Sequence, residues 1–211
     1  MCGRFYIDAD TEFLLDYYRI KYEPKVIVNQ PIIYPTQNSP VIISSQGERR
    51  MGLMQWGFRL PGSTKPIINS RAESIHEKRL FKESYEKRRC IVPATGFFEW
   101  SDLSGQKPKP KYQVTVSDQA MMSMAGIYTK VVADDGQITW HFSIVTREAN
   151  DDMKTIHPRM PLMLREEAWS AWLDMATPMR QVDTLLNMDI GHLILTKEQT
   201  QIEFDIDTFF K

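Results

Sequence analysis

Short runs of β-forming residues that end at turn residues are the feature that most constrains this fold. Between residues 41 and 146 such runs recur, rich in Val, Ile, Tyr, Phe and Trp and mostly bounded by Gly, Pro, Asn or Asp. Two connections, 101–110 and 133–137, have the composition of hairpin loops, so consecutive strands are expected to pair antiparallel. The predicted strands cover residues 41–45, 49–56, 90–93, 97–100, 112–116, 122–128 and 140–146.

Helical segments are interspersed among these strands. A capping Asp10 or Thr11 ahead of apolar residues at helical spacing predicts a helix within 10–20, after a short N-terminal strand. The pattern as a whole predicts an α+β fold, with a large and mostly antiparallel β-sheet or barrel-like core flanked by helices. The 211 residues contain no internal repeat or evident boundary, so we predict one domain over 1–211. Further helices are predicted at 72–87 with a break, 165–174 and 178–187.

Composition limits where the chain acts and what it binds. Lys and Arg total 26 against 27 Asp and Glu, a formal charge of −1, so any site for a polyanion must be local. No apolar run approaches the roughly 18 to 20 residues of a membrane span, and no secretory signal is recognisable. Two cysteines favour a reducing compartment over a disulfide scaffold. We therefore expect a cytoplasmic monomer with no membrane partner.

The sequence lacks the motifs of several common kinds of functional site. The cysteines and histidines show no metal-ligand spacing, so neither a zinc site nor another metal site is expected. There is no glycine-rich phosphate loop and no G-x-S-x-G motif, which argues against nucleotide-binding and serine-hydrolase functions. We expect no cofactor.

The N-terminus carries the most reactive pair of groups. If Met1 is removed, Cys2 presents an α-amine and a thiol on one residue, with ordinary pKa values of about 7.7 to 8.0 and 8.5. Such a 1,2-aminothiol condenses with an aldehyde, first to an imine and then to a five-membered thiazolidine. The alternative is an ordinary, inert chain start.

Three internal segments could supply the remaining chemistry. If they lie on an extended segment, Asn69 and Arg71 would share one face and place an amide beside a phosphate-binding cation; the alternative, favoured for an isolated Asn-Ser, is that Asn69 or Ser70 is a helix N-cap. Glu99 lies within the aromatic run 96–100, where it is either a partly desolvated proton carrier or an edge residue facing water. His157 lies in 156–161 between stiffening prolines, as a proton carrier or a structural hydrogen-bonding residue.

Taken in this order, the segments resemble the SOS-response-associated peptidase (SRAP) family of abasic-site processing proteins. The resemblance spans most of the chain and fades beyond about residue 175. The matching stretches are MCGRF at 1–5, YPTQ at 34–37, WGF at 56–58, KPIINSRAES at 65–74, RRCIVPATGFFEW at 88–100, MAGIY at 124–128 and IHPRMPLML at 156–164.

The resemblance implies an enzyme that covalently traps abasic sites in single-stranded DNA. Cys2 would supply both nucleophiles, and Glu99 would be the acid and base for opening the sugar. His157 would be a second proton-transfer group, and Asn69 would hold the α-amine or the sugar oxygen. The family name also implies a peptidase, and we expect proteolysis to be limited to removal of Met1, by the protein itself or by an aminopeptidase.

DNA contacts are expected around this reactive centre. Arg4 and Arg71 are the candidates for phosphate contacts, because Arg can hold phosphate oxygens bidentately. Trp56 and Phe58 are candidates for stacking on exposed bases, with core packing as the competing account of Trp56. On this hypothesis the cytoplasmic protein associates with the nucleoid when bound to DNA.

A second functional class also fits the N-terminus. An N-terminal-nucleophile amidohydrolase or glutamine amidotransferase can begin Met-Cys-Gly and use the cysteine amine as its own base. That hypothesis leaves the segments of Asn69, Glu99 and His157 unexplained, and release of ammonia from glutamine would support it.

Overall fold

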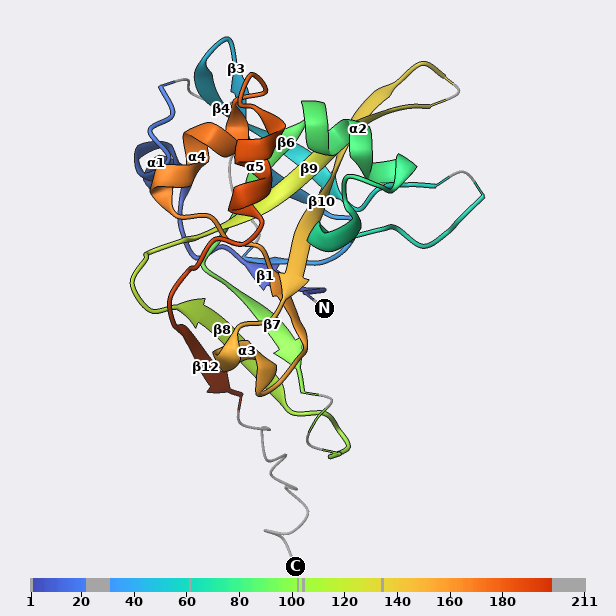
Figure 1. The fold of residues 1–211 in the computed structure, drawn as a ribbon. Coiled ribbons are helices and arrows are strands. Elements are labelled where there is room, and N and C mark those ends of the chain that lie inside the picture. Colours follow the sequence, from blue (N-terminus) through green and yellow to red (C-terminus); the bar gives the residue numbers. More distant parts are fainter. Residues whose placement is uncertain are drawn as a thin grey trace, which may run out of the picture.

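The centre of the fold is a closed β-barrel (Figure 1). The computed structural model describes residues 2–21, 31–60, 62–101, 103, 105–133 and 135–198. Within them, β10 pairs antiparallel with β9 and parallel with β4, which closes the ring in the order β10-β4-β3-β6-β9. The barrel strands are β3 (Asn38–Ser45), β4 (Glu48–Trp56), β6 (Arg89–Ala94), β9 (Met122–Val132) and β10 (Ile138–Glu148).

Two short strands extend the barrel at the end of β10. β5 (Asn69–Arg71) pairs parallel with β10, and β11 (Arg159–Pro161) pairs antiparallel with it. Thr146 is in register with Arg71 of β5 and with Pro161 of β11, so the two short strands lie on opposite sides of β10. This arrangement brings together two segments that are far apart in the sequence.

A second, wholly antiparallel sheet lies beside the barrel (Figure 1). Its strand order is β12-β8-β7-β1-β2, so the N-terminal strand β1 is held between β7 and β2. The pairing of β7 with β8 and of β9 with β10 confirms both predicted hairpins. The strands are β1 (Phe5–Tyr6), β2 (Ile32–Ile33), β7 (Gly96–Trp100), β8 (Lys111–Val116) and β12 (Leu193–Lys197).

The helices α2, α4 and α5 lie toward the end of the barrel away from this second sheet, whereas α3 lies beside β12 (Figure 1). The predicted break within 72–87 is confirmed, because a 3₁₀ turn η1 (Ala72–Ser74) precedes α2 (Arg79–Lys87). Asp10 caps α1 as expected, with its side chain accepting a hydrogen bond from the Phe13 N–H at 2.8 Å. The other helices are α1 (Thr11–Tyr17), α3 (Asp151–Lys154), α4 (Glu166–Leu173) and α5 (Met179–Leu185).

The buried Arg89 fastens two of these helices to the barrel. Its guanidinium donates to the carbonyl oxygens of Tyr85 at 2.8 Å and of Trp172 and Asp174 at 2.7 Å each. These carbonyls lie at the C-terminal ends of α2 and α4, where a cation complements the helix dipole. The α+β class, with an antiparallel sheet and a barrel flanked by helices, is thereby confirmed. Among the described residues, no helix has the length and apolar character needed to cross a membrane.

Candidate active site

Cys2 is held in a buried position immediately before β1. Its side chain is 1% exposed, and its thiol lies 3.9 Å from the carbonyl oxygen of Arg4. The same carbonyl accepts a hydrogen bond from the Phe98 N–H at 2.9 Å, which ties the N-terminal segment to β7. Burial raises the pKa of the Cys2 thiol well above its usual range, and the negative charge of Glu99 raises it further. The thiol is therefore protonated at neutral pH and needs a base to become a nucleophile.

Asn69 holds the peptide group of Cys2 through a hydrogen bond. Its side-chain amide donates to the carbonyl oxygen of Cys2 at 3.0 Å, across 67 positions in sequence. The amide oxygen of Asn69 is buried and makes no hydrogen bond in the described part of the chain. A buried acceptor left unsatisfied costs about 1–3 kcal/mol, so this oxygen is suited to receive a polar donor.

The extended conformation of β5 decides between the two interpretations of Asn69. Asn69 and Arg71 lie on a strand, and Arg71 is itself the N-cap of η1, without a side-chain capping hydrogen bond. The helix-cap alternative for Asn69 is therefore wrong. Strand alternation places Asn69 and the exposed Arg71 on the same face.

Glu99 is buried beside the thiol rather than exposed at a sheet edge. β7 is paired on both sides, by β1 and β8, and Glu99 is 5% exposed. One of its carboxylate oxygens accepts a hydrogen bond from the Trp100 N–H at 3.1 Å. The charge of this carboxylate acts on the Cys2 thiol and raises its pKa, so the two groups lie in the same region of the protein.

His157 approaches the same region through β11. The side chain is 9% exposed, and its Nδ1 lies 3.0 Å from the backbone nitrogen and 2.9 Å from the carbonyl oxygen of Arg159. An unprotonated Nδ1 accepts from the Arg159 N–H and a protonated Nδ1 donates to the Arg159 carbonyl oxygen, so Arg159 holds the ring through Nδ1 in either form. A hydrogen bond joins Asn69 to Cys2, and the charge of Glu99 acts on the Cys2 thiol. His157 is linked to β10, the strand that also pairs with β5, through β11.

Arg159 makes that link, and sequence reasoning did not single it out. Its guanidinium donates to both carboxylate oxygens of Glu73 at 2.6 and 3.0 Å, and to the Thr146 carbonyl oxygen at 2.7 Å. Thr146 is the residue of β10 that pairs with Arg71. Arg159 lies inside the stretch IHPRMP, and this position was the sequence signal that could have identified it.

A row of cations and aromatic rings begins at Arg4. The Arg4 guanidinium lies 4.6 Å from the ring centroid of Tyr34 and 4.9 Å from that of Trp100. Trp100 follows Glu99 on β7, so its side chain lies on the opposite face of the strand. Trp100 and the 40% exposed Tyr34 are further residues that the sequence reasoning did not assign, although both lie within the quoted motifs.

Trp56 and Phe58 have structural roles instead of the expected stacking on bases. They are 0% and 1% exposed, so neither presents a ring face to a ligand. Trp56 packs edge-on against Phe5 at 5.0 Å, and its indole N–H donates to the Ile68 carbonyl oxygen at 3.0 Å. The core account of Trp56 is therefore the correct one. Through these contacts it supports β1 and β5, the strands that carry Cys2 and Asn69.

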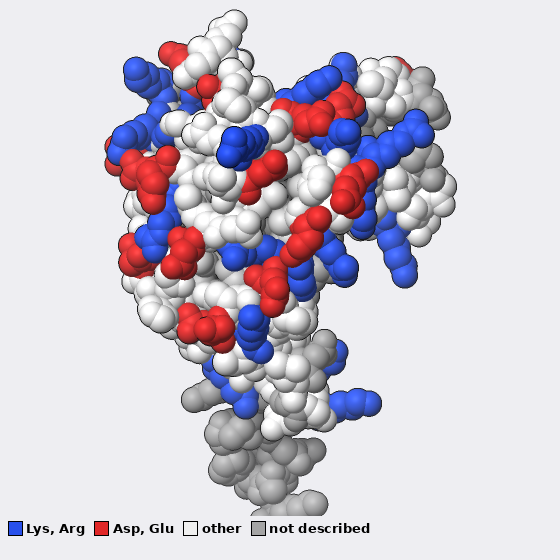
Figure 2. Space-filling model, in the orientation of Figure 1, with Lys and Arg blue, Asp and Glu red and all other residues white. Residues whose placement is uncertain are grey.

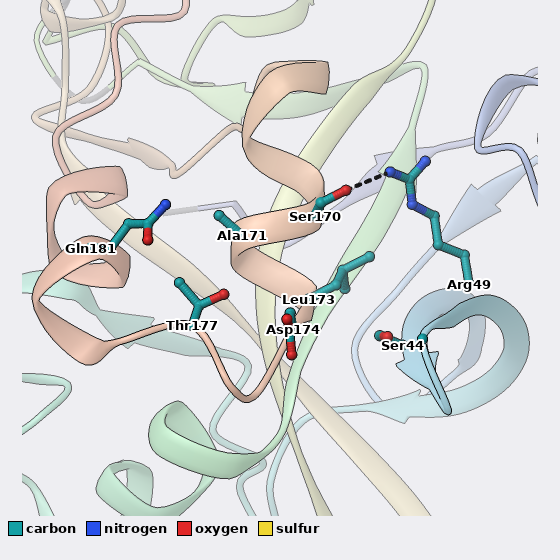
Figure 3. A pocket seen from close by; sticks show the side chains of 9 residues that line it. Ser44, Arg49, Ser170, Ala171, Leu173, Asp174, Thr177 and Gln181 are labelled. Carbon is teal, nitrogen blue, oxygen red and sulfur yellow. Dashed lines mark hydrogen bonds between the residues drawn. The ribbon is translucent and has the colours of Figure 1, made fainter.

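A hollow lined by none of these residues lies between α4, α5 and the β3–β4 turn (Figure 3). Its volume is about 360 Å³, and no cysteine or histidine is among its lining residues. Arg49 at its rim is already engaged, because it donates to Ser170 Oγ and to the Tyr18 carbonyl oxygen at 3.1 Å each. No group of three or more His, Cys, Asp or Glu suited to hold a metal occurs within the described ranges. Of the residues predicted from the sequence, Asn69 and Glu99 are the ones whose side-chain interaction with Cys2 the described part of the structure shows.

Comparisons with known proteins show what the chain as a whole is similar to. The family model described as SOS response associated peptidase (SRAP) matches residues 1–200. The chain is similar to the abasic site processing protein YoaM of Bacillus subtilis (strain 168), with 32% identity over 186 residues that cover 82% of this chain and 79% of that protein. It is also similar to the abasic site processing protein HMCES of Mus musculus, with 30% identity over 182 residues that cover 66% of this chain and 52% of that protein.

A solved structure shares the fold. The crystal structure of a protein from Bacteroides thetaiotaomicron matches with a TM-score of 0.82 and 26% identity, covering 94% of this chain and 93% of that one. Because the family model matches nearly the whole chain, and YoaM is matched over most of both proteins, this protein belongs to the SRAP family.

Proposed function

We propose that this protein, once Met1 is removed, binds single-stranded DNA and forms a covalent thiazolidine crosslink between Cys2 and the aldehyde of an abasic site. The observation that carries the proposal is the surroundings of Cys2: a buried thiol under the charge of Glu99, with the Asn69 amide on its own carbonyl oxygen. The names of the similar proteins, which describe abasic site processing, support the choice of substrate.

The proposed reaction forms two bonds at one carbon. The α-amine of Cys2 attacks C1′ of the open-chain sugar, and the resulting carbinolamine loses one water to give an imine. The thiol sulfur then bonds to C1′, the electron pair of the C=N bond returns to nitrogen, and the thiol proton ends on that nitrogen. The net change is the loss of one water per adduct.

Glu99 and His157 divide the proton transfers in this scheme. Burial keeps the thiol protonated, so Glu99 removes the sulfur-bound proton as the S–C bond forms and returns it to nitrogen. Before that step, Glu99 assists opening of the closed sugar. His157 Nε2 protonates the departing hydroxyl of the carbinolamine, while Arg159 fixes the imidazole through Nδ1. Asn69 positions the α-amine through its buried amide oxygen.

DNA binding is assigned to a local surface around this centre. Lys, Arg, Asp and Glu are interspersed over the face in Figure 2, in keeping with the formal charge of −1. Arg4 and Arg71 supply the phosphate contacts. Trp100 and Tyr34, between which Arg4 lies, supply ring faces for exposed bases in place of Trp56 and Phe58.

The free N-terminus is a condition of this function. With Met1 attached, the nitrogen of Cys2 is part of a peptide bond and cannot form an imine, so removal of Met1 is the activating step. We propose that any peptidase activity is confined to this removal. We also propose that the protein acts as a monomer in the cytoplasm, at the nucleoid, where its two buried free cysteines stay reduced.

The test is a crosslinking assay with Met1-free protein, the N-terminus being confirmed by mass spectrometry. A single-stranded oligonucleotide with one abasic site is expected to give an adduct that survives denaturing electrophoresis. The same strand without the lesion, and one carrying a reduced abasic site without an aldehyde, are expected to give none.

Two further arms separate the alternatives. Protein that retains Met1 is expected to give no adduct, and full crosslinking by that form would show that the thiol alone suffices. Release of ammonia from glutamine by the Met1-free protein, without any DNA adduct, would favour the amidohydrolase hypothesis and overturn the proposal.

A further inference from the structure

A basic hollow lies at the far end of the hairpin that carries Glu99. It is formed by the loop between β7 and β8 together with the end of β12, and its volume is about 510 Å³. Pockets for drug-sized ligands typically measure about 300–1,000 Å³, so the hollow is large enough for part of a nucleotide chain. Four lysines and one glutamate are among its lining residues: Lys107, Lys109, Lys111, Lys197 and Glu198.

Contacts between side chains connect this hollow to Arg4, two residues after Cys2. Lys111 lines the hollow, and its ammonium lies 4.1 Å from the ring centroid of Phe98 and 5.9 Å from that of Trp100. Trp100 in turn contacts Arg4, which contacts Tyr34. A continuous row of cations and rings therefore runs from the strand of Glu99 to the lysine-lined hollow.

The backbone of the loop suits a surface that follows a polyanion. Lys107, Lys109 and Lys111 alternate with two prolines, which restrict the backbone and reduce the entropy lost on binding. Lys109 and Lys111 are two residues apart, which in an extended chain is about 6.6 Å and is comparable with the distance between successive phosphates in a stretched strand. Lys107, Lys109 and Lys197 are exposed.

The charge distribution is favourable at this end of the molecule. Figure 1 places the β7–β8 loop at the end opposite the helices α2, α4 and α5, and Lys and Arg side chains project from the corresponding end of Figure 2. Lys111 pairs with Glu198 at 2.7 Å, which offsets part of the positive charge and holds β8 to the end of β12. A net positive surface at the end of an aromatic row is the usual composition of a single-strand binding track.

We propose that the lysine-lined hollow binds the sugar-phosphate backbone of the single-stranded DNA that leaves the abasic site, after that strand has passed over Trp100 and Arg4. The inference rests on the proposed function for its reactive centre. It adds a second, noncovalent contact that extends the recognised strand beyond the lesion.

The test compares two double variants that remove the same charge. Lys107→Gln/Lys197→Gln changes the hollow, and Lys82→Gln/Lys87→Gln changes exposed residues of α2 at the opposite end of the molecule. Binding of an undamaged, fluorescently labelled single strand is followed by anisotropy at several salt concentrations. Unchanged thermal unfolding of both variants establishes that their folds are intact.

The hollow variant is expected to lose two phosphate contacts. Each contact contributes about 0.7 to the slope of log K against log salt for a single strand, so the slope should fall by about 1.4, and the affinity at 0.1 M salt by about 25-fold. The α2 variant should keep the wild-type slope. Equal slopes for the two variants, or no binding of the undamaged strand by wild-type protein, would overturn the inference.

Crosslinking to strands of two lengths keeps this result separate from the proposed function. With a long abasic strand below saturation, the hollow variant should crosslink more slowly than wild type. With a strand trimmed to one nucleotide on each side of the lesion, the two proteins should react at equal rates. If no protein crosslinks either strand, the proposed function fails, and the anisotropy result still decides the role of the hollow.

Discussion

Cys2 and Cys90 are both buried thiols, and the contrast between their surroundings shows what distinguishes a reactive site from a packed core. They are 1% and 0% exposed, and burial raises the pKa of each thiol. For Cys90 on β6, burial is the cause of the raised thiol pKa. A Cβ added to the neighbouring Gly126 would lie 2.8 Å from its sulfur, so close packing confines Cys90.

The surroundings of Cys2 differ in having polar partners. The charge of Glu99 acts on its thiol, and the Asn69 amide binds its carbonyl oxygen. Burial alone therefore says little about function, because both cysteines have it. The carboxylate and the amide, carried by β7 and β5, are what make the Cys2 region suited to chemistry.

Replacing the two cysteines should have opposite consequences. Cys2→Ala removes the sulfur nucleophile and is expected to abolish the adduct that survives denaturing electrophoresis, with the fold retained. Cys90→Ala should leave crosslinking intact and lower the free energy of unfolding, because it leaves a small void in the core. Both are measured by gel assay and by denaturant unfolding. Loss of crosslinking in Cys90→Ala, with its fold intact, would contradict the assignment of Cys90 to the core alone.

The carboxylate beside Cys2 should carry the next largest effect. Glu99→Gln keeps the shape of the side chain and removes its ability to accept the thiol proton. The expected result is a crosslinking rate lowered by about 10²- to 10⁴-fold, typical of a lost general acid or base. Single-turnover kinetics with the abasic strand measure it. A rate within a factor of two of wild type would remove Glu99 from the mechanism.

The amide should matter less than the carboxylate. Asn69→Ala removes a hydrogen bond of about 0.5–1.5 kcal/mol to the Cys2 carbonyl oxygen, which corresponds to roughly a 2- to 10-fold slower reaction. Asn69→Asp is the matched control, since it keeps the size and the acceptor while losing the amide donor. If Asn69→Asp reacts as fast as wild type, the donated hydrogen bond is not what positions Cys2.

Much of this contrast was predictable from local sequence. The sequence offered a shared face for Asn69 and Arg71 beside a helix cap, and a desolvated Glu99 beside one facing water; the structure selects the first of each pair. The hairpins followed from turn residues between adjacent strands. Each of these depends on residues close together in the chain.

Features that depend on distant pairing were not predictable in this way. The parallel pairing of β10 with β4 and β5 joins residues 55–56 and 69–71 to 141–146, and no turn residue marks such a contact. The burial of Trp56 has the same origin, since its neighbours Phe5 and Phe142 come from opposite ends of the sequence. The role of Arg159 likewise requires Glu73 and Thr146 to be near.

The stability of the protein at alkaline pH gives a smaller test of the burial that the two thiols share. In the unfolded chain a thiol loses its proton above about pH 8.5, whereas the raised pKa in the folded protein keeps it protonated. The unfolded state then binds fewer protons, so stability falls as pH rises through this range. Each thiol contributes a slope of about 1.4 kcal/mol per pH unit, and Cys90→Ala should remove one such contribution between pH 9 and 10. Denaturant unfolding at several pH values measures the slope, and an unchanged slope would contradict the burial of Cys90.

The smallest expected effect concerns the DNA contacts near Cys2. Arg71→Gln removes an exposed cation on the same face as Asn69. The slope of log affinity against log salt for single-stranded DNA should fall by about 0.7, and the crosslinking rate at saturating DNA should not change. An unchanged salt slope would place Arg71 outside the DNA-binding surface.

The central claim is that both nucleophiles of one residue bond to one sugar carbon. Peptide mapping of the purified adduct by mass spectrometry tests this directly, without prior reduction by borohydride. The account predicts an N-terminal peptide beginning at Cys2, heavier by the sugar-containing fragment minus one water, with a thiol that no longer reacts with iodoacetamide. Attachment at any other residue, or a Cys2 thiol that still reacts with iodoacetamide in the adduct, would contradict it.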